Sequence, residues 1–465
     1  MRTREGVGFN FHAVSILISA LLCAFFVPQL EWRFQEPLFS NTKYMKTCEQ
    51  NGCQLLQIAS SDPVLKNALN AGFSTKEIVV PDELATIQEA VDSANPGDTI
   101  FVRSGTYFEN VVIKKSVTLI GEDASTTVID GKLLSSTMYV WANNVVVSNF
   151  TLQNSETIYP GSGVYIFDGK YNTVVGNIIE NNLVGIYLDH SQNNTLANNR
   201  ISNSYYGVWA DHVSSNNTII GNTIFSNRQA GVHAGLNSDN NTISANIFHN
   251  NMYGLFLPTN YNEVFHNNFV NNTHHAWSNA GGNKWDCDME GNYWDDYQGR
   301  DLNKDGLGNE PYLIEELGQD NYPLLGSFSE LDTGLNQIVK LISNSTIESL
   351  RYFDSNETMS IHVSGETATM GFCRVSVPKT LMNVSNLSII IDNGSASVLY
   401  FNPQVFDDQT QRGIYVEYEH SSHEITIVSE HIPLTFACAS MLVVLLFIIA
   451  KRKRCADADG IISNP

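Results

Sequence analysis

The chain has 465 residues, and its 48 acidic residues outnumber its 26 basic ones to give a net charge of -22. A chain of this length is expected to hold two or more domains. The acidic surplus excludes a nucleic-acid partner, which would need a basic face, and fits a solvent-facing body.

The first 30 residues predict a signal peptide or signal anchor. Arg2 and Arg4 precede an apolar run at 13–27, and Pro28 follows it. This layout is typical of a secretory signal. No clear small-x-small cleavage site follows, so cleavage and retention both stay open. Residues 31–77 would then form a juxtamembrane segment of an exported chain.

The next predicted element is a helix within residues 81–98. It places Ile87, Ala90, Val91 and Ala94 on one face, and the sequence NPGD ends it. Residues 99–122 are expected to form three short strands. We expect the helix to cover an open end of the repeat that follows, because a bare end would expose core and strand edges.

Residues 172–277 repeat with a period of about 22 residues, which indicates a solenoid. The main column holds Asn177, Asn199, Asn222, Asn246 and Asn267. Glycines recur at 185, 207, 231 and 254, and the first and third residues after each are apolar. Period two indicates strands, so residues 78–327 are predicted to form a parallel β-helix in which stacked asparagines form hydrogen-bonded ladders.

Residues that alternate with the core should point outward. One such column holds Tyr187, Trp209, His233 and Phe256, and beside it lie Asp189, Asp211, His190 and His212. Aromatic rings can stack on sugars, so the four residues of the column, together with His190 and His212, are candidate ligand contacts. Two aspartates on neighbouring rungs could also share a proton, as glycoside hydrolysis requires, which makes Asp189 and Asp211 candidate catalytic residues. A plain scaffold, with aromatic stacking and turn aspartates, is the third interpretation.

Residues 301–312 resemble the first half of a calcium loop. Asp301, Asn303 and Asp305 alternate before Gly306, and the Leu307 carbonyl and Asn309 extend the oxygen series. Tyr312 stands where an EF-hand needs glutamate, so this is not an EF-hand. Glu310, Asp295, Asp296 or Asp320 would complete the shell. The alternative is a polar turn without an ion.

The last third of the chain changes character. Residues 328–430 have the strand and turn pattern of a β-sandwich. Residues 431–450 include 19 residues without a charge and predict a transmembrane helix, and the basic residues 451–454 place the tail 451–465 in the cytoplasm. Five sequons are the expected glycosylation sites, at Asn344, Asn356, Asn383, Asn386 and Asn393.

Three stretches carry a family resemblance. They are the sequence at 85–122, the Asn-Asn-Thr rungs, and the closing motif at 281–325. Together they resemble NosD-type proteins of the carbohydrate-binding and sugar-hydrolase group. The resemblance implies a right-handed coil and a pectin-lyase-like fold. The sequons, the sequence GFCRVSVPK and the anchored layout also resemble archaeal surface proteins.

The same resemblance raises the question of copper, which prefers imidazole and sulfur ligands. His249, His266, His274 and His275 lie in nearby rungs without a Met or Cys cluster, so we do not expect copper.

The sequence therefore predicts an all-β protein at the cell membrane, with its body extracellular and its C-terminus cytoplasmic. The first functional hypothesis is binding of an extracellular glycan or surface protein without catalysis. The second is a polysaccharide hydrolase or lyase that uses Asp189 and Asp211. The third is a purely structural envelope protein.

Overall fold

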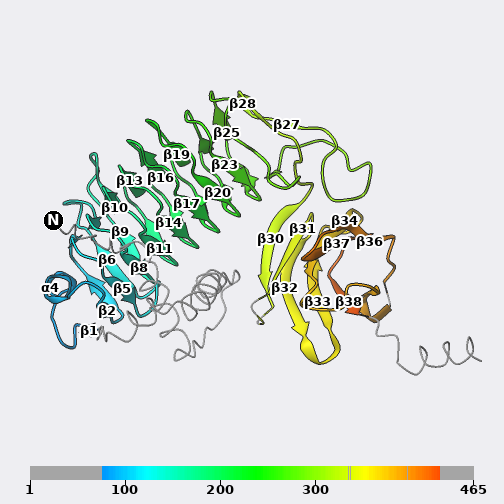
Figure 1. Ribbon diagram of the computed structural model, residues 1–465, viewed down its shortest axis with the longest axis horizontal. Helices are drawn as coiled ribbons and strands as arrows, with labels where there is room; N and C mark the ends of the chain where they lie inside the picture. Colours follow the sequence, from blue (N-terminus) through cyan, green and yellow to red (C-terminus); the bar gives the residue numbers. More distant parts are fainter. Residues whose placement is uncertain (1–75, 334, 336, 395, 430–465) are drawn as a thin grey trace, which may run out of the picture. The chain divides into compact units, whose positions relative to one another are not determined.

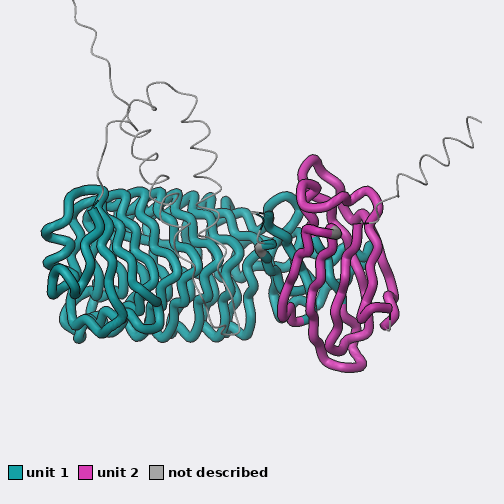
Figure 2. The backbone as a smooth tube through the Cα atoms, turned by 90° about the horizontal axis from the view of Figure 1, so that it is seen from below, with its two compact units in different colours: residues 1–345, 372–375 teal, residues 346–371, 376–465 magenta. Residues whose placement is uncertain are grey.

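The computed structural model describes residues 76–333, 335, 337–394 and 396–429. The predicted signal at 1–30, nearly all of the segment 31–77, the transmembrane helix at 431–450 and the tail lie outside these residues. None of the helices in the described ranges is long and apolar enough to cross a membrane. The chain divides into two compact units, residues 1–345 with 372–375 and residues 346–371 with 376–465 (Figure 2).

Unit 1 is built on three parallel sheets of nine strands each (Figure 1). The first sheet contains β1 (Glu77–Val80), β2 (Thr99–Val102), β5 (Thr118–Gly121), β8 (Val146–Ser148), β11 (Thr173–Val175), β14 (Thr195–Ala197), β17 (Thr218–Ile220), β20 (Thr242–Ser244) and β23 (Glu263–Phe265). The second contains β4 (Val111–Ile113), β7 (Met138–Val140), β10 (Ser162–Phe167), β13 (Val184–Asp189), β16 (Tyr206–Asp211), β19 (Ala230–Ala234), β22 (Tyr253–Phe256), β25 (His274–Ser278) and β28 (Glu315–Glu316). The third contains β3 (Gly105–Tyr107), β6 (Thr127–Asp130), β9 (Thr151–Gln153), β12 (Ile178–Glu180), β15 (Arg200–Ser202), β18 (Thr223–Phe225), β21 (Ile247–His249), β24 (Asn268–Val270) and β26 (Tyr293–Trp294).

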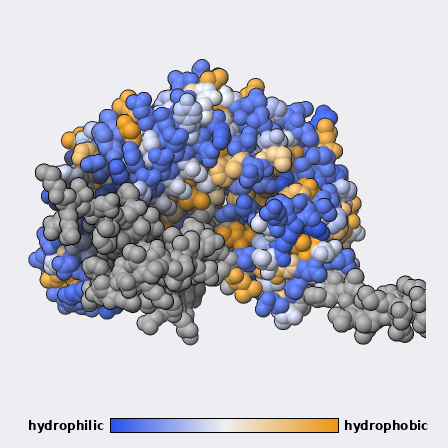
Figure 3. All heavy atoms as spheres, viewed as in Figure 1, coloured by the Kyte–Doolittle hydropathy of each residue, from blue (hydrophilic) through white to orange (hydrophobic). Residues whose placement is uncertain are grey.

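Each turn of the chain therefore adds one strand to every sheet, as expected for a parallel β-helix. The apolar residues that alternate along the strands point into one continuous core. In the second sheet, Ile186, Val208, Val232 and Leu255 are in register and at most 1% exposed. The visible surface of the solenoid is mostly hydrophilic (Figure 3). The predicted solenoid is confirmed.

The predicted capping helix is also present, as α4 (Ile87–Ser93). Thr86 begins it with a capping box, in which its side chain accepts from the Glu89 N–H and the Glu89 side chain accepts from the Thr86 N–H. All four predicted apolar residues, Ile87, Ala90, Val91 and Ala94, are buried. Residues 99–122 form four strands where three were predicted, because each of these short segments pairs with a strand on the next turn.

The asparagine columns form the predicted ladders. Along Asn177, Asn199, Asn222, Asn246, Asn267 and Asn292, each side-chain amide donates to the next Oδ1 at 2.9–3.1 Å. The Oδ1 also accepts from the backbone N–H of the preceding asparagine. The amides therefore satisfy buried backbone groups where the chain turns between sheets. Asp320 ends this ladder by accepting from the backbone N–H of Asn292 at 2.7 Å.

Glycine is required at the start of the second-sheet strands because the rungs approach closely there. A Cβ on Gly185, Gly207 or Gly231 would lie 2.4–2.6 Å from the carbonyl oxygen of the equivalent glycine on the next rung. Any larger residue would push the backbones apart.

Antiparallel strands follow the solenoid (Figure 1). A two-stranded sheet pairs β27 (Tyr312–Leu313) with β29 (Gln319–Asp320). A five-stranded sheet has the order β30 (Ser327–Asp332), β31 (Ile338–Ser343), β34 (Met370–Pro378), β37 (Gln411–Glu419) and β36 (Tyr400–Asp407). A four-stranded sheet has the order β32 (Thr346–Phe353), β33 (Thr358–Ser364), β38 (His423–Ser429) and β35 (Leu387–Ile391). A 3₁₀ turn, η2 (Asp354–Asn356), lies between β32 and β33, and a second, η3 (Asp392–Gly394), follows β35. The described residues of the region 328–430, in which a β-sandwich was predicted, thus form antiparallel sheets.

Candidate functional site

The predicted outward column of the second sheet is a continuous row of rings, which we call the aromatic row. Tyr187, Trp209, His233 and Phe256 are register partners on successive strands. The row continues to Tyr165 and Tyr139 on one side and to Trp277 on the other. Neighbouring ring centroids lie 4.4–5.8 Å apart. Residues from seven turns of the chain therefore share one face.

Most ring faces in this row are used by neighbouring rings. Trp209 and His233 stack with 4° between their planes, and Phe256 and Trp277 stack with 7°. Tyr187 is fully buried, and its hydroxyl lies 2.6 Å from the hydroxyl of Tyr159. These stacked ring faces are therefore occupied by their neighbours within the row.

Beside the row lies a group of four residues, Asp189, His190, Asp211 and His212, which we call the Asp–His cluster. Asp189 and Asp211 end strands β13 and β16 and are register partners. His190 and His212 follow with φ values of 54° and 48°. Because both strands turn at the same point, the two imidazole rings stack 5.3 Å apart with 3° between their planes.

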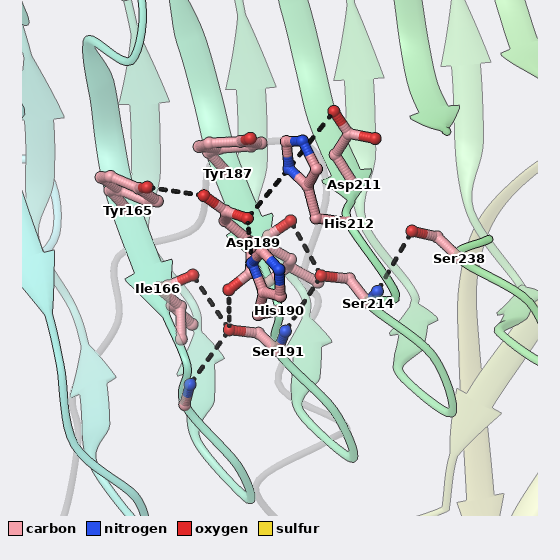
Figure 4. A network of polar contacts seen from close by, with 12 residues as sticks. Tyr165, Ile166, Tyr187, Asp189, His190, Ser191, Asp211, His212, Ser214 and Ser238 are labelled. Atoms are coloured by element: carbon pink, nitrogen blue, oxygen red, sulfur yellow. Dashed lines mark hydrogen bonds and ion pairs between the residues drawn. The ribbon is translucent and has the colours of Figure 1, made fainter. Parts of the chain in front are cut away.

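Asp189 is the centre of this cluster. Its Oδ1 lies 2.7 Å from His190 Nδ1 and 3.0 Å from His212 Nδ1. Its Oδ2 accepts a hydrogen bond from the Tyr165 hydroxyl at 2.8 Å (Figure 4). Burial and this contact raise the pKa of Tyr165 above its ordinary value, so the hydroxyl stays a donor. One carboxylate thus joins three rungs of the solenoid.

Asp211 contributes differently. Its Oδ2 lies 3.7 Å from His212 Nδ1, while its buried Oδ1 has no hydrogen-bond partner among the described residues. Burial raises the pKa of Asp211 above its ordinary value. The next rung has Gly235 at the equivalent position, where a Cβ would lie 3.0 Å from Asp211 Oδ1 and 3.5 Å from His233 Nε2.

Trp209 and His233 complete what we call the polar notch, made of Trp209, Asp211, His233 and Gly235. Trp209 Nε1 and His233 Nδ1 are also buried without a partner in the described part of the chain. Burial lowers the pKa of His233 to about 4, so this imidazole is neutral near pH 7. The notch therefore offers a free donor, a free carboxylate oxygen and a neutral imidazole.

The predicted calcium loop is held together by hydrogen bonds to its own backbone. Asp301 accepts from the N–H groups of Asp305 and Gly306, and Asp305 Oδ1 accepts from Leu307 N–H. Asn309 Oδ1 accepts from the N–H of Leu302, and the side chain of Asn303 donates to Asp305 Oδ2. Gly306 has a φ of 80°, as the sharp turn requires. Calcium at this loop stays a prediction.

Two other groups place three ligand atoms within 4.8 Å of one another in the described residues. One is Asp189, His190 and His212, and the other is His275, Asp295 and Asp296. The four histidines considered for copper do not share a site. His249 stacks on Phe225, His266 contacts Glu290, His274 contacts Glu315, and His275 contacts Asp295. The sequence did contain the signal for the first group, in the Asp-His pair that recurs after 22 residues.

Four of the expected glycosylation sites, Asn344, Asn383, Asn386 and Asn393, have exposed side chains. Asn356 lies in η2, and its side chain is outside the described set. Exposure is compatible with modification at the four sites.

Residues 91–299 match the family described as "Periplasmic copper-binding protein (NosD)". This range covers the strands of all three sheets from β2 to β26. The match therefore lies within the parallel β-helix, and it agrees with the resemblance that the sequence motifs carry.

The solved structures that the chain matches include an alginate lyase from Paenibacillus sp. str. FPU-7. It is 14% identical, with a TM-score of 0.30, and the match covers 45% of this chain and 95% of that one. A second is the pectate lyase Pel9A, 14% identical, with a TM-score of 0.36 and coverage of 48% and 76%. A third is the Agl-KA catalytic domain, 17% identical, with a TM-score of 0.37 and coverage of 49% and 46%. No curated protein sequence matches the chain.

The family description names copper. The ligand atoms of the Asp–His cluster can be compared with those that copper prefers. Asp189, His190 and His212 offer two imidazole nitrogens and a carboxylate oxygen, which suit a first-row divalent cation. The free cysteines of the described residues, Cys287 and Cys373, are not part of this group. The fit is therefore to a site of nitrogen and oxygen ligands, without sulfur.

Proposed function

We propose that the protein is a membrane-anchored cell-surface β-helix protein that binds a glycan at the polar notch without chemical change. The observation that carries the proposal is that Trp209 Nε1, Asp211 Oδ1 and His233 Nδ1 are three buried polar atoms without hydrogen-bond partners among the described residues, on the neighbouring strands β16 and β19. A buried polar group without a hydrogen bond costs ~1–3 kcal/mol. A ligand that supplies the missing partners recovers that free energy.

A sugar hydroxyl has the required chemistry because it both donates and accepts hydrogen bonds. It can accept from Trp209 Nε1–H and donate to Asp211 Oδ1. Gly235 lies beside both Asp211 Oδ1 and His233 Nε2, and a Cβ at this position would be 3.0 Å and 3.5 Å from them. The two nearby aspartates and the net charge of -22 favour a neutral glycan over an acidic one.

The test is a glycan array probed with the full-length protein, followed by calorimetry with the best neutral ligand. Gly235→Ala fills the space beside Asp211 Oδ1, and Trp209→Phe removes the free N–H but keeps a ring. Each should weaken binding by about tenfold, the effect of one lost hydrogen bond of ~1.4 kcal/mol.

Trp277→Phe is the matched control, because Trp277 belongs to the same aromatic row outside the notch. It should leave the affinity unchanged. Equal affinity for all four proteins would refute binding at the notch. An array without any bound glycan would favour the purely structural envelope protein.

A second candidate is a polysaccharide hydrolase or lyase that uses Asp189 and Asp211. The observation in its favour is that burial raises the pKa of Asp211, while Asp189 contacts two imidazoles. Two carboxyl groups in such different surroundings can divide acid and base roles. Reducing ends released from a neutral or acidic polysaccharide, and lost in Asp211→Asn, would support it. Release that survives this substitution would exclude these residues as catalysts.

We further propose that the chain is anchored through residues 432–450, with the basic residues 451–454 in the cytoplasm. Protease added outside intact cells should then remove the solenoid and leave a short membrane-bound fragment. Complete protection from the protease would contradict this orientation.

A further inference from the structure

We propose that Asp189, His190 and His212 form a binding site for a first-row divalent cation, with zinc as the reference metal. The site goes beyond glycan binding and does not depend on it. Its three ligand atoms, Asp189 Oδ1, His190 Nδ1 and His212 Nδ1, lie within 4.8 Å of one another. They come from two successive rungs, so the coiling of the chain builds the site.

The contact between His212 and Asp189 favours a cation over a simple hydrogen bond. His212 Nδ1 is only 3.0 Å from Asp189 Oδ1, yet this buried nitrogen has no hydrogen bond among the described residues. His212 Nδ1 is therefore close to Asp189 Oδ1 but does not form a hydrogen bond with it. A metal ion accepts the lone pairs of neutral imidazole and carboxylate at the same time and needs no such alignment.

Asp211 is the nearest additional ligand. Its Oδ2 lies 3.7 Å from His212 Nδ1, and its carboxyl group is more than nine-tenths buried. Its other oxygen has no hydrogen-bond partner within the described ranges. A buried carboxylate with an unused oxygen gains more from a nearby cation than an exposed one, because burial has removed its hydration. Two imidazoles and one or two carboxylates are a common ligand set for zinc.

The residues around the site are arranged to hold the first ligand in place. The Tyr165 hydroxyl donates a hydrogen bond to Asp189 Oδ2. The other carboxylate oxygen, Oδ1, contacts the two imidazoles. Outer hydrogen bonds of this kind orient metal-binding carboxylates. His190 and His212 share a left-handed backbone conformation, with φ values of 54° and 48°, and their rings stack with 3° between the planes. Imidazole ligands favour zinc or copper(II) over calcium, which prefers oxygen alone.

The first test is zinc titration of the chelator-treated full-length protein by calorimetry, with stoichiometry from mass spectrometry of bound metal. We expect one zinc ion at this site. His190→Asn and His212→Asn should each weaken zinc binding at least tenfold, since removal of even an outer-shell partner typically costs 10–100-fold. Asparagine tolerates the left-handed backbone of these turns, so folding should be preserved. His274→Asn is the control, because His274 pairs with the single carboxylate of Glu315.

A second pair of variants tests the outer hydrogen bond. Tyr165→Phe should weaken zinc binding by about tenfold, whereas Tyr139→Phe, one rung away in the aromatic row, should not. Copper(II) in place of zinc gives a spectroscopic readout. Its paramagnetic resonance spectrum should show coupling to two imidazole nitrogens in the native protein and to one in His190→Asn or His212→Asn.

Three results would overturn the proposal. The first is the absence of stoichiometric zinc. The second is calcium binding at the same residues more tightly than zinc. The third is zinc that persists in His190→Asn but disappears in His275→Asn, which would assign the ion to the group of His275, Asp295 and Asp296.

Discussion

The main asparagine ladder can be tested at its middle rung by Asn222→Ala. Asn222 is fully buried. Its Oδ1 accepts from the backbone N–H of Asn199 at 2.9 Å and from the Asn199 amide at 3.0 Å. Its own amide donates to the Leu196 carbonyl at 2.8 Å and to Asn246 Oδ1 at 3.0 Å. The amide also donates to the Ile220 carbonyl at 3.2 Å, so alanine removes five hydrogen bonds.

The expected loss of stability follows from the hydrogen-bonding groups that lose their partner in Asn222→Ala. The Asn199 amide keeps its bond to the Val174 carbonyl, and Asn246 Oδ1 keeps the N–H of residue 222. The backbone N–H of Asn199 loses its partner, at a cost of ~1–3 kcal/mol, and the other lost bonds cost ~0.5–1.5 kcal/mol each. Together they predict a decrease of about 4 kcal/mol in the free energy of unfolding.

Urea denaturation monitored by tryptophan fluorescence measures this difference, and hydrogen exchange shows whether the rungs next to Asn222 open first, as expected for a solenoid. The control is Asn216→Gly, an exposed turn residue with a φ of 58°, where glycine causes no strain. The control should change stability by less than ~0.5 kcal/mol. A loss below ~1 kcal/mol in Asn222→Ala would refute the ladder argument, because one orphaned N–H alone should cost that much.

Three further predictions concern other parts of unit 1. Gly207→Ala would place a Cβ 2.5 Å from the Gly231 carbonyl oxygen, so it should lower the urea midpoint by the equivalent of ~1–3 kcal/mol. Burial outweighs the hydrogen bonds to Asp320 and raises its pKa from 3.8 to about 7. The folded state therefore holds this proton while the unfolded state loses it, and the contribution of Asp320 to stability should fall as the pH rises from ~4 to ~7. Asp320→Asn should remove that part of the slope in thermal melts measured across this range, and an unchanged slope would contradict the assignment. If Asp301 and Asp305 hold calcium, a hundredfold excess of calcium over its dissociation constant should stabilise the fold by ~2.7 kcal/mol, and an unchanged melting temperature with and without chelator would exclude a structural ion.

The sequence alone was enough to predict the solenoid. The period of about 22 residues placed asparagines, glycines and apolar pairs in columns, and stacked turns are the simplest way to bury every column at once. The same periodicity correctly placed Tyr187, Trp209, His233 and Phe256 in one row. The capping helix could be predicted because its four apolar residues follow helical spacing before a strong stop signal.

The contacts and the burial of each functional side chain were decided only by the tertiary structure. Periodicity indicates which residues share a face, but it does not show that Tyr159 covers Tyr187, or that Tyr165 from another rung reaches Asp189. It also gives no sign that two histidines meet at one oxygen of Asp189 while Asp211 keeps an oxygen free. These contacts depend on turn conformations and side-chain rotamers across neighbouring rungs. They are set by the packing between neighbouring coils, which the sequence repeat alone does not specify.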